Sequence, residues 1–163
     1  MTAPGDGICF RDASLTIDAD HVIVRYIRSR LGDKAGNESD AISIAGGHNI
    51  IMDHCSASWS VDECFSCSTG QKGKIDSITV QWSIISEALN KSIHRKGAHG
   101  YGALIRGGYG ARYTYNHNLF AHNYSRNPWP GNYNYNNYRR DPEGLQFDFR
   151  NNVIYNWGGS RPG

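Results

Sequence analysis

Short runs with apolar outer positions and a variable middle position recur along the chain. Five such triplets begin 28, 28, 35 and 34 residues apart: Val22-Ile23-Val24, Ile50-Ile51-Met52, Ile78-Thr79-Val80, Tyr113-Thr114-Tyr115 and Phe147-Asp148-Phe149. The middle position drifts from Ile to Thr to Asp, so the alternation has the period of two that is typical of a strand whose outer residues face a core. The pattern therefore predicts a strand at the start of each of five repeats.

A turn and a second short strand are predicted after each triplet. Five residues into each unit the same register reaches Ile27, Cys55, Ser83, Asn118 and Asn152. Asparagine serves turns and stacked ladders well, so we interpret Asn118 and Asn152 as structural. Units of this size cannot bury their inner faces alone and must stack. The prediction is an all-β fold, a right-handed parallel β-helix of about five to six coils, in a single domain over residues 1–163.

A second column of apolar residues supports the stacking. The segments 41–44, 64–67 and 103–105 read as equivalent strands on another face, with their leading residues Ala41, Cys64 and Ala103 as neighbours. The two long intervals between triplets contain the insertions NKSIHRKGAHGYG and NYSRNPWPGNYNYNNYRRDPEG. Extra residues in a solenoid collect as loops on one face, often the binding face. The chemistry of the chain is expected there.

Composition narrows the classes of partner. The 163 residues carry a formal net charge of +2, without the large basic field of a nucleic-acid binder, and no apolar run is long enough to span a bilayer. The segment MTAPGDGICF lacks the basic and apolar regions of a signal peptide, so any export signal is expected outside this sequence. The four cysteines fit either two disulfides or four small buried residues.

Stacking would bring acidic residues together. If residues 41–44 and 64–67 are adjacent rungs, Asp40 and Glu63 are neighbours at the strand entrances, with Glu38 and Asp62 close by. Like charges at that spacing repel, so either some of these carboxyl groups are protonated or a cation holds them, and hard carboxylate oxygens suit Ca²⁺. The alternative is a solvated acidic rim without metal.

Three other patterns are weaker. Cys64-x-x-Cys67 beside Cys55 and His54 lies inside a predicted strand, which disfavours zinc. The run GYGALIRGGYG lacks the strand and helix that flank a dinucleotide site. The histidines that could act as bases are His94, His99, His117 and His122. His117 lies at a repeating strand-turn position and is interpreted as structural, whereas His99, in the first long loop, is the better candidate.

Four stretches of the sequence resemble the pectate lyases of the first polysaccharide lyase family, which are right-handed parallel β-helices. They are NIIMDHCSASWSVDE, SITVQWSIISEAL, HNLFAHNYSRNP and FRNNVIYNWGG. Together these stretches are specific, and the resemblance extends over nearly the whole chain. The third is similar to the family's R-x-P motif, so the resemblance makes Arg126 the residue that removes the C5 proton of a galacturonate. Arginine is normally protonated, so the site would have to acidify the substrate, for which Ca²⁺ bridging protein and substrate carboxylates is suited.

The family's calcium ligands carry over in part. Two upstream acids match Glu38 and Asp40, and the acid after Asp53-His54 matches Asp62. The next acid of the family falls at Ser66, which leaves either Glu63 as a substitute or a weaker calcium site. Asp53-His54 itself lies in the repeated strand and its turn, and we interpret it as structural.

The substrate-binding lysine of the family falls at Lys96, which is predicted as both a catalytic and a substrate-binding residue, with Arg95 as the alternative. Pro128 and His99 are further predicted substrate contacts. The family's second arginine is absent, because position 131 is Gly. Arg139 or Arg140 is the predicted replacement, against a solvated turn as the other reading.

Aromatic residues crowd the second insertion. They either stack on sugars or pack the loop: Trp129, Tyr133, Tyr135 and Tyr138.

The resemblance implies an acidic polysaccharide, polygalacturonate or pectin, as the partner, with secretion or a periplasmic location, and the protein is expected to bind neither nucleic acid nor membrane. A calcium-independent pectin lyase is disfavoured by the acidic cluster, and a polygalacturonase by the lack of paired aspartates. A non-catalytic carbohydrate-binding β-helix remains an alternative, motivated by Ser66 and Gly131. Relatives in this family are longer, so further coils are expected, and exposed solenoid ends favour self-association.

Overall fold

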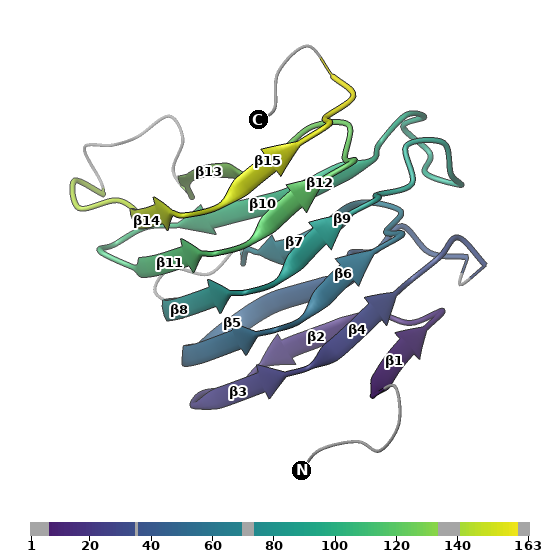
Figure 1. Ribbon diagram of the computed structural model, residues 1–163. Coiled ribbons are helices and arrows are strands. Elements are labelled where there is room, and N and C mark those ends of the chain that lie inside the picture. The colour runs from purple at the N-terminus through teal and green to yellow at the C-terminus, as the bar shows by residue number, and fades with distance from the viewer. Residues whose placement is uncertain (1–6, 35, 70–73, 134–140, 160–163) are drawn as a thin grey trace.

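The strands of the chain form three ladders that run the length of the molecule. The computed structural model describes residues 7–34, 36–69, 74–133 and 141–159, and these contain fifteen strands and no helix (Figure 1). Every strand pairing is parallel. The fold is therefore the predicted parallel β-helix. Within the described residues no helix could span a membrane.

The three ladders define three faces. Face A consists of β1 (Ile8–Arg11), β4 (Ile27–Arg30), β6 (Ser56–Ser58), β9 (Ile84–Ser86), β12 (Leu119–Ala121) and β15 (Val153–Tyr155). Face B consists of β2 (Leu15–Asp18), the first part of β5 (Ile42–Asp53), β7 (Glu63–Cys67), β10 (Tyr101–Gly107) and β13 (Trp129–Asn132). Face C consists of β3 (Val22–Arg25), the second part of β5, β8 (Ile75–Gln81), β11 (Arg112–Asn116) and β14 (Gln146–Arg150).

The triplets found in the sequence are the core strands of face C. Their first residues align in one row, Val22, Ile50, Ile78, Tyr113 and Phe147. The outer residues of the three middle triplets are almost completely buried, as the alternation predicts. Burial of each such side chain stabilises the fold by about 1.5–3 kcal/mol. The repeat was therefore visible in the sequence because stacking requires an apolar residue at the same place in every coil.

The second predicted column is correct for two coils and displaced by one residue in the third. Ile42 pairs with Phe65, so Ala41 and Cys64 are neighbours, but Phe65 pairs with Ala103. Gly102 thus takes the place that the sequence pattern gave to Ala103. A Cβ at Gly102 would lie 2.5 Å from the carbonyl oxygen of Arg126. The close approach of that loop requires glycine here, and the sequence alone did not show it.

The corner between faces C and A turns through a left-handed residue in each coil. Tyr26, His54, Trp82, His117 and Asn151 occupy this position with φ between 48° and 57°. The rings of Trp82 and His117 stack with their centroids 4.2 Å apart. Non-glycine residues are uncommon in this region of φ and ψ, so the stacking of coils holds the corner in place. His117 is a corner residue, which agrees with its structural interpretation.

The next residue in each coil closes the corner with a side-chain ladder. The amide of Cys55 donates to Ser83 Oγ, the amide of Ser83 to Asn118 Oδ1, and the amide of Asn118 to Asn152 Oδ1, at 2.9–3.0 Å. Both asparagines are thus structural, as predicted.

The cysteines do not form the two disulfides that were one alternative. In the described part of the chain all four are free, with Cys55, Cys64 and Cys67 buried and Cys9 exposed. Cys64 Sγ contacts the carbonyl oxygen of Ser86 at 3.2 Å. The three buried residues therefore act as small core residues, which was the other alternative for them.

Candidate functional site

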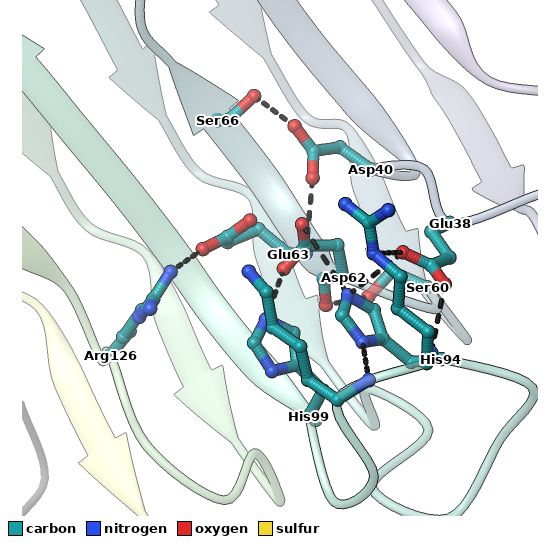
Figure 2. A network of polar contacts seen from close by, with 12 residues as sticks. Glu38, Asp40, Ser60, Asp62, Glu63, Ser66, His94, His99 and Arg126 are labelled. Atoms are coloured by element: carbon teal, nitrogen blue, oxygen red, sulfur yellow. Dashed lines mark hydrogen bonds and ion pairs between the residues drawn. The ribbon is translucent and has the colours of Figure 1, made fainter.

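Acidic residues gather where the strands of face B begin. Asp40 lies just before β5 and Glu63 begins β7, and the amide of Glu63 donates to Asp40 Oδ1 at 3.0 Å (Figure 2). Tyr101, which begins β10, aligns with Glu63 on one side and with Ser125 on the other. The stacking of coils therefore makes Asp40 and Glu63 neighbours, as the alignment of rungs predicts.

Asp40, Asp62 and Glu63 form one compact group of carboxylates. One oxygen from each lies within 4.8 Å of the other two. Burial, together with the charges of Asp40 and Asp62, raises the pKa of Glu63 to about 9. Burial also raises the pKa of Asp40. The hydrogen bond from Ser66 lowers this pKa, and the charge of Asp62 raises it further. The group therefore holds negative charge at a cost that a bound cation would remove.

The carboxylate group fits the demands of calcium. Two oxygens bound to one calcium ion, each about 2.4 Å from it, are separated by no more than about 4.8 Å. Asp62 Oδ1 is buried beside His99 Nε2, which lies 2.9 Å away, and it keeps a further lone pair that a cation could use. Ser66, where the family has an acid, donates through Oγ to Asp40 Oδ2 and so orients a carboxylate instead of supplying one.

Glu38, the fourth predicted ligand, lies beside this group with other partners. Its Oε1 accepts from the amide of Arg95 at 2.8 Å, and its Oε2 lies 3.3 Å from Arg95 Nε. His94 Nε2 is 3.6 Å from the same Oε2. Through these contacts with His94 and Arg95, Glu38 holds the first long loop next to the acidic cluster.

Two buried histidines cover the other side of Asp62. The rings of His94 and His99 stack with centroids 3.8 Å apart, and His99 Nε2 lies 2.9 Å from Asp62 Oδ1. Burial lowers the pKa of His99, which favours its neutral form at pH 7. These three residues could also surround a metal ion. However, His94 Nδ1 accepts from the amide of Lys96 at 3.1 Å, so the proton of neutral His94 is on Nε2, and this disfavours a metal there.

Arg126 approaches the carboxylate group from the loop between β12 and β13. Its Nη1 donates to Glu63 Oε1 (Figure 2). Its guanidinium lies 4.0 Å from the ring centroid of Tyr101 and 4.8 Å from that of Trp129. The side chain is 19% exposed. The predicted base is thus held between two aromatic rings, with one end against the acidic cluster.

The backbone of Arg126 is fixed by its own loop and by β10. Its φ is 58°, and its carbonyl oxygen accepts from the amide of Ala103 at 2.6 Å. Asn123, which is buried, donates to Asn127 Oδ1 at 2.8 Å and to the carbonyl of Ile85 at 3.0 Å. These bonds set the path of the loop and therefore the direction of the arginine side chain.

The other predicted site residues divide by location. Lys96 is exposed on the first long loop, close enough to His99 for its charge to act on that ring, and Pro128 is half-buried after Arg126. His99 packs under Asp62, with little of its side chain exposed. Trp129 is 43% exposed, whereas Tyr133 is half-buried. Arg139 and Arg140, with Tyr135 and Tyr138, lie outside the described residues.

Sequence reasoning missed three features that shape the site: Tyr101, Asn123 and the role of Ser66 as a hydrogen-bond donor. Tyr101 belongs to the glycine-rich run GYG, which was read only as a failed dinucleotide motif. Its value comes from pairing with Glu63 across a coil boundary, 38 positions away in the chain. A tyrosine beside Gly102 was the available signal, because that glycine marks a close backbone approach.

Comparison with known proteins gives several curated relatives, although no protein-family model matches the chain. Proteins named probable pectate lyase C from Aspergillus terreus and from Emericella nidulans are each 40% identical to it over 160 residues. One from Aspergillus flavus is 38% identical over the same length. Each match covers 98% of this chain and 32% of the relative, so the chain spans about a third of the length of the curated relatives it matches.

Proposed function

Because this chain is related to the pectate lyases over 98% of its length, we propose that it cleaves polygalacturonate, the demethylated form of pectin, by calcium-dependent β-elimination. The C5–H bond of one galacturonate breaks and its electron pair forms a C4=C5 double bond. The C4–O bond breaks with its electrons on oxygen. Arg126 takes the C5 proton and the departing oxygen takes up a proton, so the net reaction consumes no water.

The crowding of Asp40, Asp62 and Glu63 carries the calcium part of this proposal. Three carboxylates within 4.8 Å of one another, with the pKa of Glu63 raised to about 9 by burial and by the other two charges, favour a divalent cation. Calcium bound by these residues would join protein and substrate carboxylates and stabilise the negative charge that develops as C5 loses its proton. Glu38 adds an oxygen at the edge of the group.

The position of Arg126 supports its role at C5. The guanidinium lies at the border between the carboxylates and the exposed ring of Trp129, where a sugar whose carboxylate faces Asp40 and Asp62 would place its ring. The rings of Tyr101 and Trp129 both contact the guanidinium, and bonds of Asn123 and Ala103 fix the backbone of its loop. Such restriction reduces the reorganisation needed when the proton moves.

Lys96 is the better candidate for binding a substrate carboxylate. The side chain of Arg95 is engaged with Glu38, whereas Lys96 is exposed on the same loop and only its amide is fixed, by His94. His99 lies beneath Asp62 and holds that carboxylate in place from below. Because pectic polymers occur outside the cell, we also propose that the protein is exported.

The test is the ultraviolet absorbance of the unsaturated product during incubation with polygalacturonate. The rise should require added Ca²⁺, disappear with chelator and be lost in Arg126→Ala. Arg112→Ala, on face C, is the matched control and should keep the rate of the wild type. A rise that is equally fast in chelator would contradict the calcium part, and a rise in Arg126→Ala would contradict the assignment of the base.

A non-catalytic protein that binds the same polymer is the second candidate function. It is favoured by one observation, the replacement of a family acid by Ser66, which leaves three carboxylates in the cluster. Polymer binding in the presence of Ca²⁺ without any rise in absorbance would select this function. Cleavage of methylated pectin in chelator would instead indicate a calcium-independent pectin lyase.

A further inference from the structure

Arg106 on β10 fills the space above a glycine of the neighbouring strand. Arg106 and Gly131 are paired in the register between β10 and β13. A Cβ built on Gly131 would overlap Arg106 Nη1, whose guanidinium therefore crosses the strand directly over this position. Gly131 has no positive φ, so a side chain at this position would displace the Arg106 guanidinium without straining the backbone.

The same guanidinium reaches the aromatic ring that contacts Arg126. Arg106 lies 5.1 Å from the ring centroid of Trp129, and its Nη1 lies 3.5 Å from the Trp129 carbonyl oxygen. Arg126 lies 4.8 Å from the same centroid. Two cationic side chains from different coils thus share one ring, which is itself 43% exposed.

We propose that Arg106, with Trp129 as its platform, binds a carboxylate of the acidic polymer next to the sugar at Arg126. This inference rests on the proposed function and adds to it a residue for substrate binding. The planar fork of an arginine suits a carboxylate, which it can bind through two parallel hydrogen bonds. The shared ring keeps Arg106 on the exposed side of face B, beside the residues that would act on the neighbouring sugar.

The distribution of charge across face B gives the direction of the polymer. Acidic residues occupy the β5 and β7 side, at Asp40, Asp62 and Glu63, and arginines occupy the β10 and β13 side, at Arg126 and Arg106. A polymer with one carboxylate on every sugar can satisfy both sides at once, with one carboxylate at the acidic cluster and a later one at Arg106. We therefore place the chain of sugars across the strands of face B.

The experiment measures binding of a short galacturonate oligomer by calorimetry in Ca²⁺, together with kcat and KM on polygalacturonate. Arg106→Gln should weaken binding roughly tenfold and raise KM with little change in kcat, because the residue contacts a sugar that does not react. Gly131→Ala keeps the net charge but displaces the guanidinium, and should weaken binding in the same direction. Arg112→Gln removes an arginine from face C and should leave both values unchanged.

A variant that exchanges the two residues separates a loss of binding from a loss of folding. The double variant Arg106→Gly with Gly131→Arg moves the guanidinium to the opposite strand of the same register pair and should recover most of the lost affinity. Equal binding by wild type, Arg106→Gln and Gly131→Ala would overturn the inference while leaving the proposed function intact. A wild type that neither binds nor cleaves the oligomer would overturn the proposed function and this inference with it.

Discussion

Arg126 donates a hydrogen bond to Glu63 (Figure 2). Glu63 also has a carboxylate oxygen within 4.8 Å of oxygens of Asp40 and Asp62, close enough for all three to bind one metal ion. The residue proposed to take the substrate proton and a residue proposed to bind calcium are therefore partners of each other. Glu63 cannot serve a guanidinium and a divalent cation equally with the same oxygen. Metal binding and the position of the arginine are consequently coupled through this side chain.

Removing that arginine should strengthen calcium binding. In Arg126→Ala, Glu63 loses a competing cation, and we expect the affinity for Ca²⁺ to rise roughly tenfold, equivalent to about 1.4 kcal/mol. Calorimetry without substrate measures this directly. Arg95→Ala, which removes one side-chain partner of Glu38, is the matched control. Its effect should be smaller because Glu38 lies outside the group of three carboxylates. Weaker calcium binding in Arg126→Ala would contradict the competition.

Ser66→Ala should weaken calcium binding. The change removes the hydroxyl that orients Asp40 and leaves that half-buried carboxylate with one donor fewer. We expect the dissociation constant for Ca²⁺ to increase several-fold, in line with about 1 kcal/mol for one such hydrogen bond. Ser58→Ala, which removes a buried serine of face A, is the control for general destabilisation. An unchanged constant would mean that Asp40 is oriented without Ser66.

Asp53 should make the stability of the fold depend on pH in acid. Burial disfavours its charged form, but hydrogen bonds from His54, Gln81 and Arg25 outweigh burial and hold the pKa of Asp53 below its ordinary value of 3.8. The unfolded chain therefore takes up this proton first as the pH falls. The stabilisation is complete above about pH 4 and is lost as the pH falls through the folded-state pKa.

Asp53→Asn tests this assignment by chemical denaturation at several pH values. At pH 7 the variant should be less stable than the wild type by about 1–3 kcal/mol, and the difference should shrink in acid. Asp148→Asn, which changes a half-exposed pair with Arg150, should cost less than about 1 kcal/mol. A difference between Asp53→Asn and wild type that stays constant from pH 7 to pH 3 would show that Asp53 is not the titrating group.

Asn118→Ala should be among the most destabilising single changes at a polar residue. Asn118 is buried, accepts from the amide of Ser83, and donates to the carbonyl of Val80 at 2.9 Å and to Asn152 Oδ1 at 3.0 Å. Its loss leaves buried backbone groups without partners, at about 2–4 kcal/mol. Asn156→Ala, at an exposed residue with φ of 49° and a bond to His122, should cost less, about 1 kcal/mol. Thermal unfolding of the two variants provides the comparison.

The faces of the solenoid were predictable from the sequence, whereas its corners were not. The inward positions of face C must be apolar in every coil, so Ile50, Ile78 and Tyr113 reveal the period directly. The left-handed corner contains Tyr26 and Trp82, neither of which is a residue that normally indicates positive φ. Stacking of successive coils stabilises this conformation, so the cause lies in tertiary structure.

The acidic half of the site followed from the alignment of rungs, and the basic half required the structure. Asp40 and Glu63 precede strands of known register, so their proximity could be inferred. Arg126 lies in a loop whose path depends on Asn123 and on the absence of a side chain at Gly102. Residue spacing does not determine such a path. The contact of Arg106 with Trp129 depends in the same way on Gly131.

The ladder of corner bonds through Ser83, Asn118 and Asn152 gives the solenoid a direction. At three successive corners the backbone amide donates to a side chain of the coil that follows in the chain. Removal of a coil from the amino-terminal end therefore removes a donor amide, and no buried amide of the remaining coils loses its acceptor. Removal of the coil that carries Asn152 strips the amide of Asn118 of its partner. Loss of a coil from the carboxyl-terminal end should consequently lower the stability of the fold more than loss of a coil from the amino-terminal end.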